Sequence, residues 1–304
     1  QRSILLRELI FGIGFLIVVL IRGTNPDIAG TEKPMEMMFI NSILRSDTLP
    51  PADGWLSGYS ISYYYFGYLI TALLVQLSRV PSEVGFNLML ATVFGMASAG
   101  AFELVNEWLN QRAGHRQDHV RIFGGALFAP VFVLILGNLE GLFESLHSLH
   151  IGWTAEGTSG FWSWLGLKEL VDAPRLPASI DPTARPGIWW WRASRVLSDI
   201  GLDGTSHEVI DEFPFFSFYL GDLHPHVIAI PFVLLAIAAG WTLFRAASNE
   251  ARLDWARITV HSAIRAWGRL IQRHEFWIGA LVIGGSLFMN TWDFPFLFLL
   301  TVAA

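Results

Sequence analysis

Three short polar strings interrupt long apolar runs in this sequence and hold most of the side chains that could do chemistry. They read NPDIAGTEKP at 25–34, GDLHPH at 221–226 and NTWDFP at 290–295. A helix that only faces lipid has no need of such residues, because ionisable groups are costly in hydrocarbon. The strings are therefore the first places to look for a catalytic or binding site.

The string at 221–226 is the densest of the three. Pro225 favours extended backbone at the preceding residue, and alternate residues of an extended segment point the same way. We therefore expect Asp222, His224 and His226 to share one face. A carboxylate and two imidazoles could bind a divalent metal ion or do acid–base work. In the alternative interpretation, the string only caps the next apolar helix and bonds to nearby loops.

The string at 25–34 places two carboxylates and a lysine just after the first apolar run. Pro34 suits the first turn of a helix, and apolar residues follow at helical spacing, so we expect a short interfacial helix over 34–45. Asp27 could act as a general base or a metal ligand, with Glu32 as a second carboxylate and Lys33 on a phosphate. Alternatively, Asp27 forms a turn and Glu32 starts the helix.

Aromatic residues and arginines make up a further group. Trp190 lies in a run of three tryptophans beside Arg192 and Arg195, and Tyr64 lies in a run of three tyrosines. Such rings could anchor the chain at the headgroup level. Alternatively, an indole face supports a sugar or a headgroup while the arginine forks hold phosphate oxygens. Asp293, in the third string, could be a turn carboxylate or a site member.

The composition indicates that these residues belong to an integral membrane protein. The chain is 53% hydrophobic and 15% charged, with a mean hydropathy of +0.45. Soluble domains have roughly 25% charged residues. There are no cysteines, so disulfides and thiolate metal sites are excluded. The first apolar run lacks a cleavage site and is predicted to be a permanent anchor. The sequence stops inside an apolar run, so we expect a single transmembrane domain over 1–304 that is part of a longer chain.

The lengths of the apolar runs predict the spans, because a helix needs ~20 residues to cross the hydrocarbon core. The run at 64–78 is shorter than this and is expected to lie at the interface. The predicted spans are 4–21, 84–104, 121–137, 227–244, 276–289 and a truncated one at 294–304.

Basic residues set the predicted orientation, because cytoplasmic segments are enriched in lysine and arginine. The large segment 138–226 has five basic and twelve acidic residues, which favours the outer side. All three polar strings then lie on that outer side, where separate loops could form one site. The predicted cytoplasmic segments are the N-terminus, 107–121 and 245–275, and the predicted outer segments are 22–83 and 138–226.

Several classes of function lack support in the sequence. There is no phosphate-binding glycine-rich loop, no nucleophile elbow and no HExxH zinc motif. The predicted spans carry few charges, which argues against an ion pathway through them. The arginines of 245–273 alternate with apolar residues, a pattern typical of a helix on anionic lipid rather than of nucleic-acid binding.

Four segments together carry a resemblance to a known family. They are NPDIAGTEKPMEMMFINSILRS, PPADGWLSGYSISYYYFGY, EFPFFSFYLGDLHPH and NTWDFP. With these, the chain resembles the N-terminal part of the prokaryotic YYY membrane protein family, a group of polytopic membrane proteins named for a tyrosine triplet, here 63–65. The family is similar in layout to the GT-C glycosyltransferases, which take a sugar from a polyprenyl-phosphate donor on the outer membrane face.

This resemblance implies an all-α, GT-C-like helical bundle with juxtamembrane helices and a large outer loop. It places Asp27 where those enzymes carry an acidic residue near the end of the first span. The implied function is sugar transfer from a lipid-linked donor in a prokaryotic plasma membrane, with a cytoplasmic N-terminus. No second acidic motif follows in the next outer loop unless GDLHPH replaces it, so a divalent metal cofactor is left open. The alternatives are a non-catalytic subunit that binds a protein partner through the outer loop, and a lipid-handling or transport protein.

Overall fold

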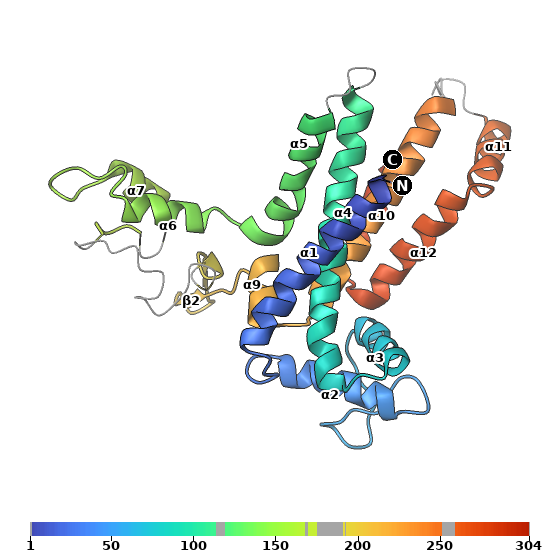
Figure 1. Cartoon of the computed structure of the whole chain (residues 1–304), viewed down its shortest axis with the longest axis horizontal. Coiled ribbons are helices and arrows are strands. Elements are labelled where there is room, and N and C mark those ends of the chain that lie inside the picture. Colours follow the sequence, from blue (N-terminus) through green and yellow to red (C-terminus); the bar gives the residue numbers. More distant parts are fainter. Residues whose placement is uncertain are drawn as a thin grey trace. The chain divides into compact units, whose positions relative to one another are not determined.

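The computed structural model describes residues 2–113, 119–167, 170–174, 191, 193–250 and 259–303, and most of these are helical (Figure 1). The chain forms two compact units. One unit comprises residues 1–130 and 221–304, and the other comprises residues 131–220. All three polar strings belong to the first unit, whereas most of the predicted outer loop 138–226 belongs to the second.

The first unit is built from apolar helices joined by short polar turns. Its helices are α1 (Arg2–Thr24), α2 (Lys33–Arg45), α3 (Phe66–Ser78), α4 (Ser82–Ala113), α5 (His119–Val131), α10 (Pro225–Glu250), α11 (Val260–Leu270), α12 (His274–Met289) and α13 (Asp293–Ala303). The helix predicted over 34–45 is present as α2, which begins one residue earlier and has Pro34 in its first turn, and its place at the membrane interface stays a prediction.

Three of the described helices are long and apolar enough to cross a membrane: Ile4–Thr24, Ser82–Ala113 and Pro225–Arg245. A bent pair, Arg121–Leu136 with Glu140–Ser148, adds a fourth if it counts as one span. The helices in 274–302 are apolar but shorter, so their crossing stays a prediction. The helix at Phe66–Ser78 has 13 residues, fewer than the ~20 that a span requires.

Close packing of α1 on α4 forms the centre of this unit. A Cβ atom at Gly95 of α4 would lie 2.9 Å from the backbone oxygen of Phe11 in α1. Only glycine permits this approach, as in other closely packed membrane helices. α10 packs against α4, α12 and α13. The exposed faces are apolar, with Leu16 and Leu20 of α1 54% and 63% exposed, as expected for helices that face lipid.

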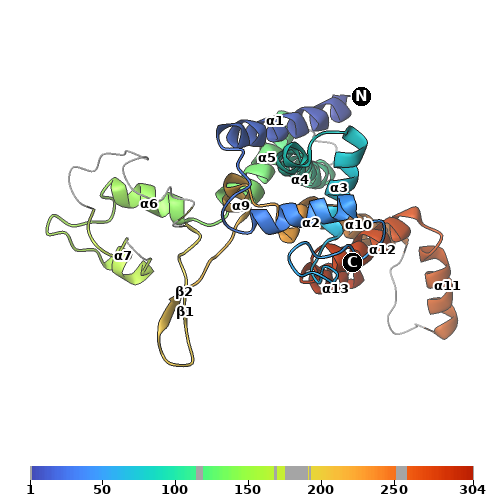
Figure 2. The same cartoon turned by 90° about the horizontal axis from the view of Figure 1, so that it is seen from below.

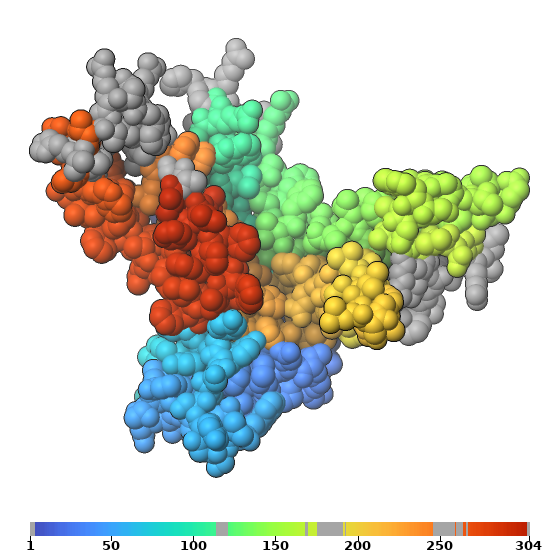
Figure 3. Space-filling view, turned by 180° about the vertical axis from the view of Figure 1, so that it is seen from behind, coloured from blue at the N-terminus to red at the C-terminus, as the bar shows by residue number. Residues whose placement is uncertain are grey.

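Two short helices, α2 and α3, lie across one end of these long helices. Figures 1 and 2 place them beside the end of α1 and the starts of α4 and α10. α2 packs on α3 through Phe39 and Tyr68, whose ring centroids are 5.3 Å apart. α3 also meets α12, with the rings of Phe66 and Phe288 6.4 Å apart. Figure 3 shows from behind that the red C-terminal part of the chain adjoins the blue and cyan segments. The polar strings meet at this end.

The second unit contains short elements. They are a π-helical turn η1 (Phe132–Leu136), helices α6 (Glu140–Ser148), α7 (Gly160–Leu165) and α9 (Pro214–Leu220), and strands β1 (Ser198–Ile200) and β2 (Ser206–Glu208). The strands form an antiparallel hairpin, which the expectation of an all-α fold did not include. Its cause is local: the Asp203–Gly204 turn lets the N–H of Gly201 bond to the carbonyl of Thr205 at 2.9 Å.

Candidate functional site

The site lies in the first unit, where the stretch after α1, the start of α2 and the turn before α10 meet. Glu36, in the first turn of α2, connects these parts. Its helix turns Lys33, Glu36, Phe39 and Ile40 inward, and the Glu36 side chain is fully buried. Oε2 of Glu36 accepts the backbone N–H of Leu223 at 2.9 Å. This bond holds the turn before α10 against α2.

His224 lies among three carboxylates. Its Nδ1 atom is 3.1 Å from Oε2 of Glu32, 3.4 Å from Oε1 of Glu36 and 3.9 Å from Oδ2 of Asp222. Its Nε2 atom is 3.0 Å from the hydroxyl oxygen of Tyr63. Glu32, Glu36, Asp222 and His224 are called the carboxylate–histidine cluster below.

The cluster favours the charged imidazole. Burial lowers the pKa of His224, but the close contact with the Glu36 carboxylate and the charges of Asp222, Glu32 and Glu36 outweigh it, so this pKa lies above its ordinary value. Burial likewise raises the pKa of the Tyr63 hydroxyl, and the charges of Glu32 and Glu36 add to this rise. Tyr63 is therefore a neutral hydrogen-bonding partner of the imidazole.

Lys33 lies next to the cluster rather than on the surface. It is 7% exposed and interacts electrostatically with Asp222, Glu36 and Asp27. Burial lowers the pKa of Lys33, and the positive charge of Arg22 lowers it further, while the three carboxylates oppose this shift. The side chain therefore balances charge inside the site. Lys33 was expected from the sequence to bind a phosphate, but the side chain is too buried to do so directly.

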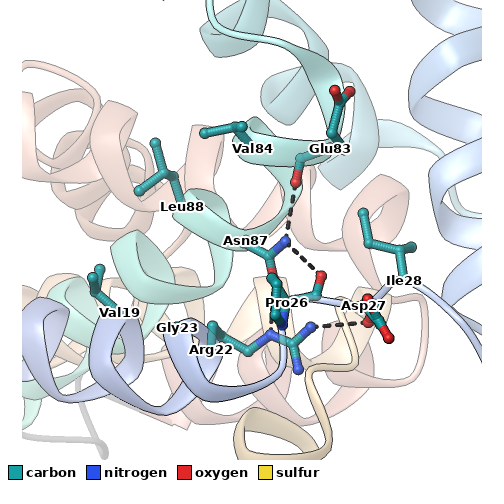
Figure 4. Close-up of a pocket in the computed structure, with 10 residues that line it drawn as sticks. All are labelled: Val19, Arg22, Gly23, Pro26, Asp27, Ile28, Glu83, Val84, Asn87 and Leu88. Atoms are coloured by element: carbon teal, nitrogen blue, oxygen red, sulfur yellow. Dashed lines mark hydrogen bonds between the residues drawn. The ribbon is translucent and has the colours of Figure 1, made fainter.

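A groove of about 500 Å³ opens beside the cluster, between the end of α1 and the start of α4 (Figure 4). One wall is apolar and includes Val19, Val84 and Leu88. The polar residues that line it are Arg22, Asp27, Glu83 and Asn87. The groove thus combines a lipid-like wall with charged groups.

A network of hydrogen bonds around Asn87 shapes this groove. Nε of Arg22 donates to Oδ1 of Asn87 at 2.7 Å, and Nη2 of Arg22 donates to the backbone oxygen of Asp27 at 3.0 Å. Nδ2 of Asn87 donates to the backbone oxygens of Pro26 and Glu83 at 3.1 and 3.0 Å. The backbone N–H of Asp27 donates to Oδ1 of Asn25 at 3.2 Å, so its backbone is held while the side chain is exposed.

Arg22 also connects the groove to the turn before α10. Arg22 is 4% exposed, and its guanidinium packs against Gly221, whose φ is +81°. A Cβ atom at Gly221 would fall on the guanidinium. Glycine is therefore required here both for its backbone conformation and for the space it leaves. The contact between Arg22 and Gly221 therefore joins the groove to the turn that carries Asp222 and His224.

The predicted metal group is brought together only in part. α10 begins at Pro225, so His226 lies in its first turn rather than on an extended face with Asp222 and His224. The rings of His224 and His226 are 5.1 Å apart, but His226 interacts electrostatically with Asp293. Among the described residues, the ligand-type atoms that converge belong to Glu36, Asp222 and His224.

The other predicted residues have mixed positions. Tyr64 is half-buried with its ring 5.2 Å from Tyr63, and Tyr63 is the member of the triplet that reaches the cluster. Arg195 lies in the second unit, where its guanidinium is 3.6 Å from the centre of the Trp191 ring and 3.9 Å from Glu208. Trp190 and Arg192 lie outside the described residues.

Two important residues were missed by reasoning from the sequence. Glu36 carries a signal in retrospect, because it shares a helix face with Phe39 and Ile40, and a carboxylate on an apolar face requires a polar partner. Asn87 carries none, because an asparagine within a predicted span does not reveal which carbonyls it will bond.

The long apolar helices and the polar site at their end define a helical membrane protein. The chain belongs to the family described as "Uncharacterized membrane protein (DUF2298)", whose profile matches residues 1–304. No curated protein and no solved structure matches the chain. The expected membrane protein of many helices is thereby confirmed at the level of the family and of the helical fold.

Proposed function

We propose that the protein transfers a sugar from a polyprenyl-phosphate donor at the outer face of the membrane, with Asp27 as the general base. One observation carries this proposal. Asp27 lines a groove of about 500 Å³ that is also lined by the apolar side chains of Val19, Val84 and Leu88. A lipid-linked donor requires that combination, because its tail stays in the bilayer while its phosphate and sugar react at the surface.

The arrangement of Asp27 suits a base. A general base must reach the acceptor hydroxyl, so its carboxylate must be exposed to the substrate. It must also be held in position by its surroundings. The side chain of Asp27 is exposed, while its backbone is bonded to Arg22 and Asn25. Within the proposed reaction, Asp27 takes the proton of the acceptor hydroxyl as that oxygen forms its bond to the sugar and the lipid phosphate leaves.

Two cationic side chains near Asp27 favour an anionic donor. Arg22 lines the groove but is only 4% exposed, and Lys33 is 7% exposed, so both cations would act on the phosphate through their charge rather than by direct contact. Fixed cations beside a leaving phosphate stabilise the charge that develops on it. Glu32 was expected to be a second catalytic carboxylate, but it pairs with His224 at 3.1 Å and does not line the groove. Asp27 is therefore proposed as the single base.

Asp27→Asn tests the proposal, because the amide is nearly isosteric but cannot accept the proton. The full-length protein in proteoliposomes would be supplied with polyprenyl-phosphate-linked hexoses and an extract of its host membranes as acceptor. Release of polyprenyl phosphate, measured by mass spectrometry, should fall to background in Asp27→Asn while donor binding persists. Asp47→Asn is the control, because Asp47 is an exposed carboxylate after α2 that does not line the groove.

Two results would contradict this function. Transfer by Asp27→Asn at the wild-type rate would exclude Asp27 as the base. Absence of donor binding and turnover in the wild-type protein would instead favour a non-catalytic membrane subunit, in which the groove is a packing surface.

A further inference from the structure

The carboxylate–histidine cluster brings metal-binding side chains together from two distant parts of the chain. One oxygen atom each from Glu36 and Asp222 and one ring nitrogen of His224 lie within 4.8 Å of one another. Glu36 is fully buried and Asp222 is 4% exposed. Buried carboxylates have lost their hydration, so they must be paired with cations or hydrogen-bond donors. Without a metal ion, Lys33 and the charged imidazole of His224 balance these two carboxylates.

Two buried polar atoms at this place have unused bonding capacity. Oε1 of Glu36 makes no hydrogen bond within the described part of the chain, although it faces Nδ1 of His224 at 3.4 Å. The hydroxyl of Tyr68, a fully buried residue, also lacks a hydrogen-bond partner there, and it interacts electrostatically with Glu36 and Asp222. Buried polar groups are nearly always satisfied in native proteins. These atoms therefore indicate that a polar or ionic ligand completes the cluster.

The orientation of the imidazole points to a cation. Tyr63 lies 3.0 Å from Nε2 of His224, which turns Nδ1 toward the carboxylates. A metal ion would displace the proton on Nδ1, because a histidine ligand must be neutral. With Nε2–H donating to the tyrosine oxygen, the lone pair of Nδ1 then faces Glu36 and Asp222. A metal ion accepts electron pairs from all three groups at once, and histidine ligands commonly donate their other ring N–H to a fixed oxygen in this way.

We propose that Glu36, Asp222 and His224 bind one divalent transition-metal ion, Zn²⁺ or Mn²⁺. An imidazole nitrogen with two carboxylate oxygens suits these ions better than the all-oxygen sites that Ca²⁺ and Mg²⁺ prefer. The side chains of His224 and Glu32 are 18% and 55% exposed, so one edge of the group is open. An open edge can admit a further ligand, as in catalytic rather than closed structural sites. The proposal does not depend on sugar transfer.

Metal binding is tested directly with the purified chain in detergent micelles. Chelator-treated protein would be titrated calorimetrically with Zn²⁺ and with Mn²⁺, and the bound metal counted by elemental mass spectrometry. We expect one ion per chain in the wild type. Glu36→Gln and His224→Asn should weaken binding by more than about 100-fold, because losing even an outer-shell partner of a metal ligand costs ~10–100-fold.

His226→Asn is the matched control, because it removes a neighbouring imidazole that lies outside the converging group. It should keep wild-type affinity and stoichiometry. Thermal unfolding of each chelator-treated variant checks that it is folded. Added Zn²⁺ should raise the melting temperature of the wild type and of His226→Asn, but not of Glu36→Gln or His224→Asn. The absence of a stoichiometric ion in the wild type would overturn the proposal, and so would equal losses of affinity in His226→Asn and His224→Asn.

Discussion

Replacing Gly221 by alanine should disrupt both parts of the site through a single contact. Gly221 has a φ of +81°, and a Cβ atom added to it would collide with the guanidinium of Arg22. Gly58 has a φ of +84° with no atom within 4 Å of a built Cβ. The two glycines therefore form a matched pair. Both alanine variants are strained in the backbone, but only Gly221→Ala must displace a buried arginine.

The contacts of Arg22 set how much more unfolding free energy Gly221→Ala should lose than Gly58→Ala. An alanine in the left-handed region costs about 1–2 kcal/mol, which both variants lose. Displacing Arg22 breaks its bonds to Asn87 at 2.7 Å and to the Asp27 carbonyl at 3.0 Å. A hydrogen bond from a charged donor contributes about 1.5–3 kcal/mol. Gly221→Ala should therefore lower the free energy of unfolding by about 3 kcal/mol more than Gly58→Ala, allowing for partial recovery of these bonds.

The assay is denaturant unfolding of the purified protein in mixed micelles, followed by tryptophan fluorescence. Arg22→Lys provides a second comparison, because lysine lacks the fork that bonds both Asn87 and Asp27. Gly221→Ala combined with Arg22→Lys should then cost less than the sum of the two single changes. Equal destabilisation by Gly221→Ala and Gly58→Ala would refute the reasoning, since it would mean that Arg22 does not depend on the space at Gly221.

Two further predictions concern contacts of the carboxylate–histidine cluster, and a third concerns the predicted orientation in the membrane. Glu36→Ala should lower the free energy of unfolding by about 3–5 kcal/mol, because it breaks a buried charged pair. Glu36→Gln keeps one acceptor and should cost clearly less in the same denaturant titration. Similar losses in the two variants would contradict the 2.9 Å hydrogen bond from the N–H of Leu223 to Glu36. Tyr63→Phe removes the 3.0 Å hydrogen bond to the imidazole but keeps the ring, so it should cost about 1 kcal/mol, and an unchanged unfolding curve would contradict this. For topology, Ser57 lies in a predicted outer segment and Gln272 in a predicted cytoplasmic one, and both are exposed. Because these 304 residues contain no cysteine, Ser57→Cys should react with an impermeant maleimide in intact cells and Gln272→Cys should not. The reverse pattern would invert the predicted orientation.

The sequence by itself determined the features that depend on local composition. The lengths of the apolar runs predicted long helices over 4–21, 84–104 and 227–244, because only such runs can cover a bilayer. Pro34 and the spacing after it predicted α2, since proline in a first turn and helical periodicity are properties of neighbouring residues. The polar strings were also visible as places for chemistry.

Only the tertiary structure decided which side chains meet. Glu36 and Leu223 are 187 positions apart and are joined because α2 packs against the turn before α10. His224 turns toward the carboxylates and His226 toward Asp293 because α10 begins between them, at Pro225. Arg22 meets Asn87 because α1 packs on α4. Each of these contacts depends on how helices distant in the sequence pack, and a pattern of neighbouring residues carries no record of that packing.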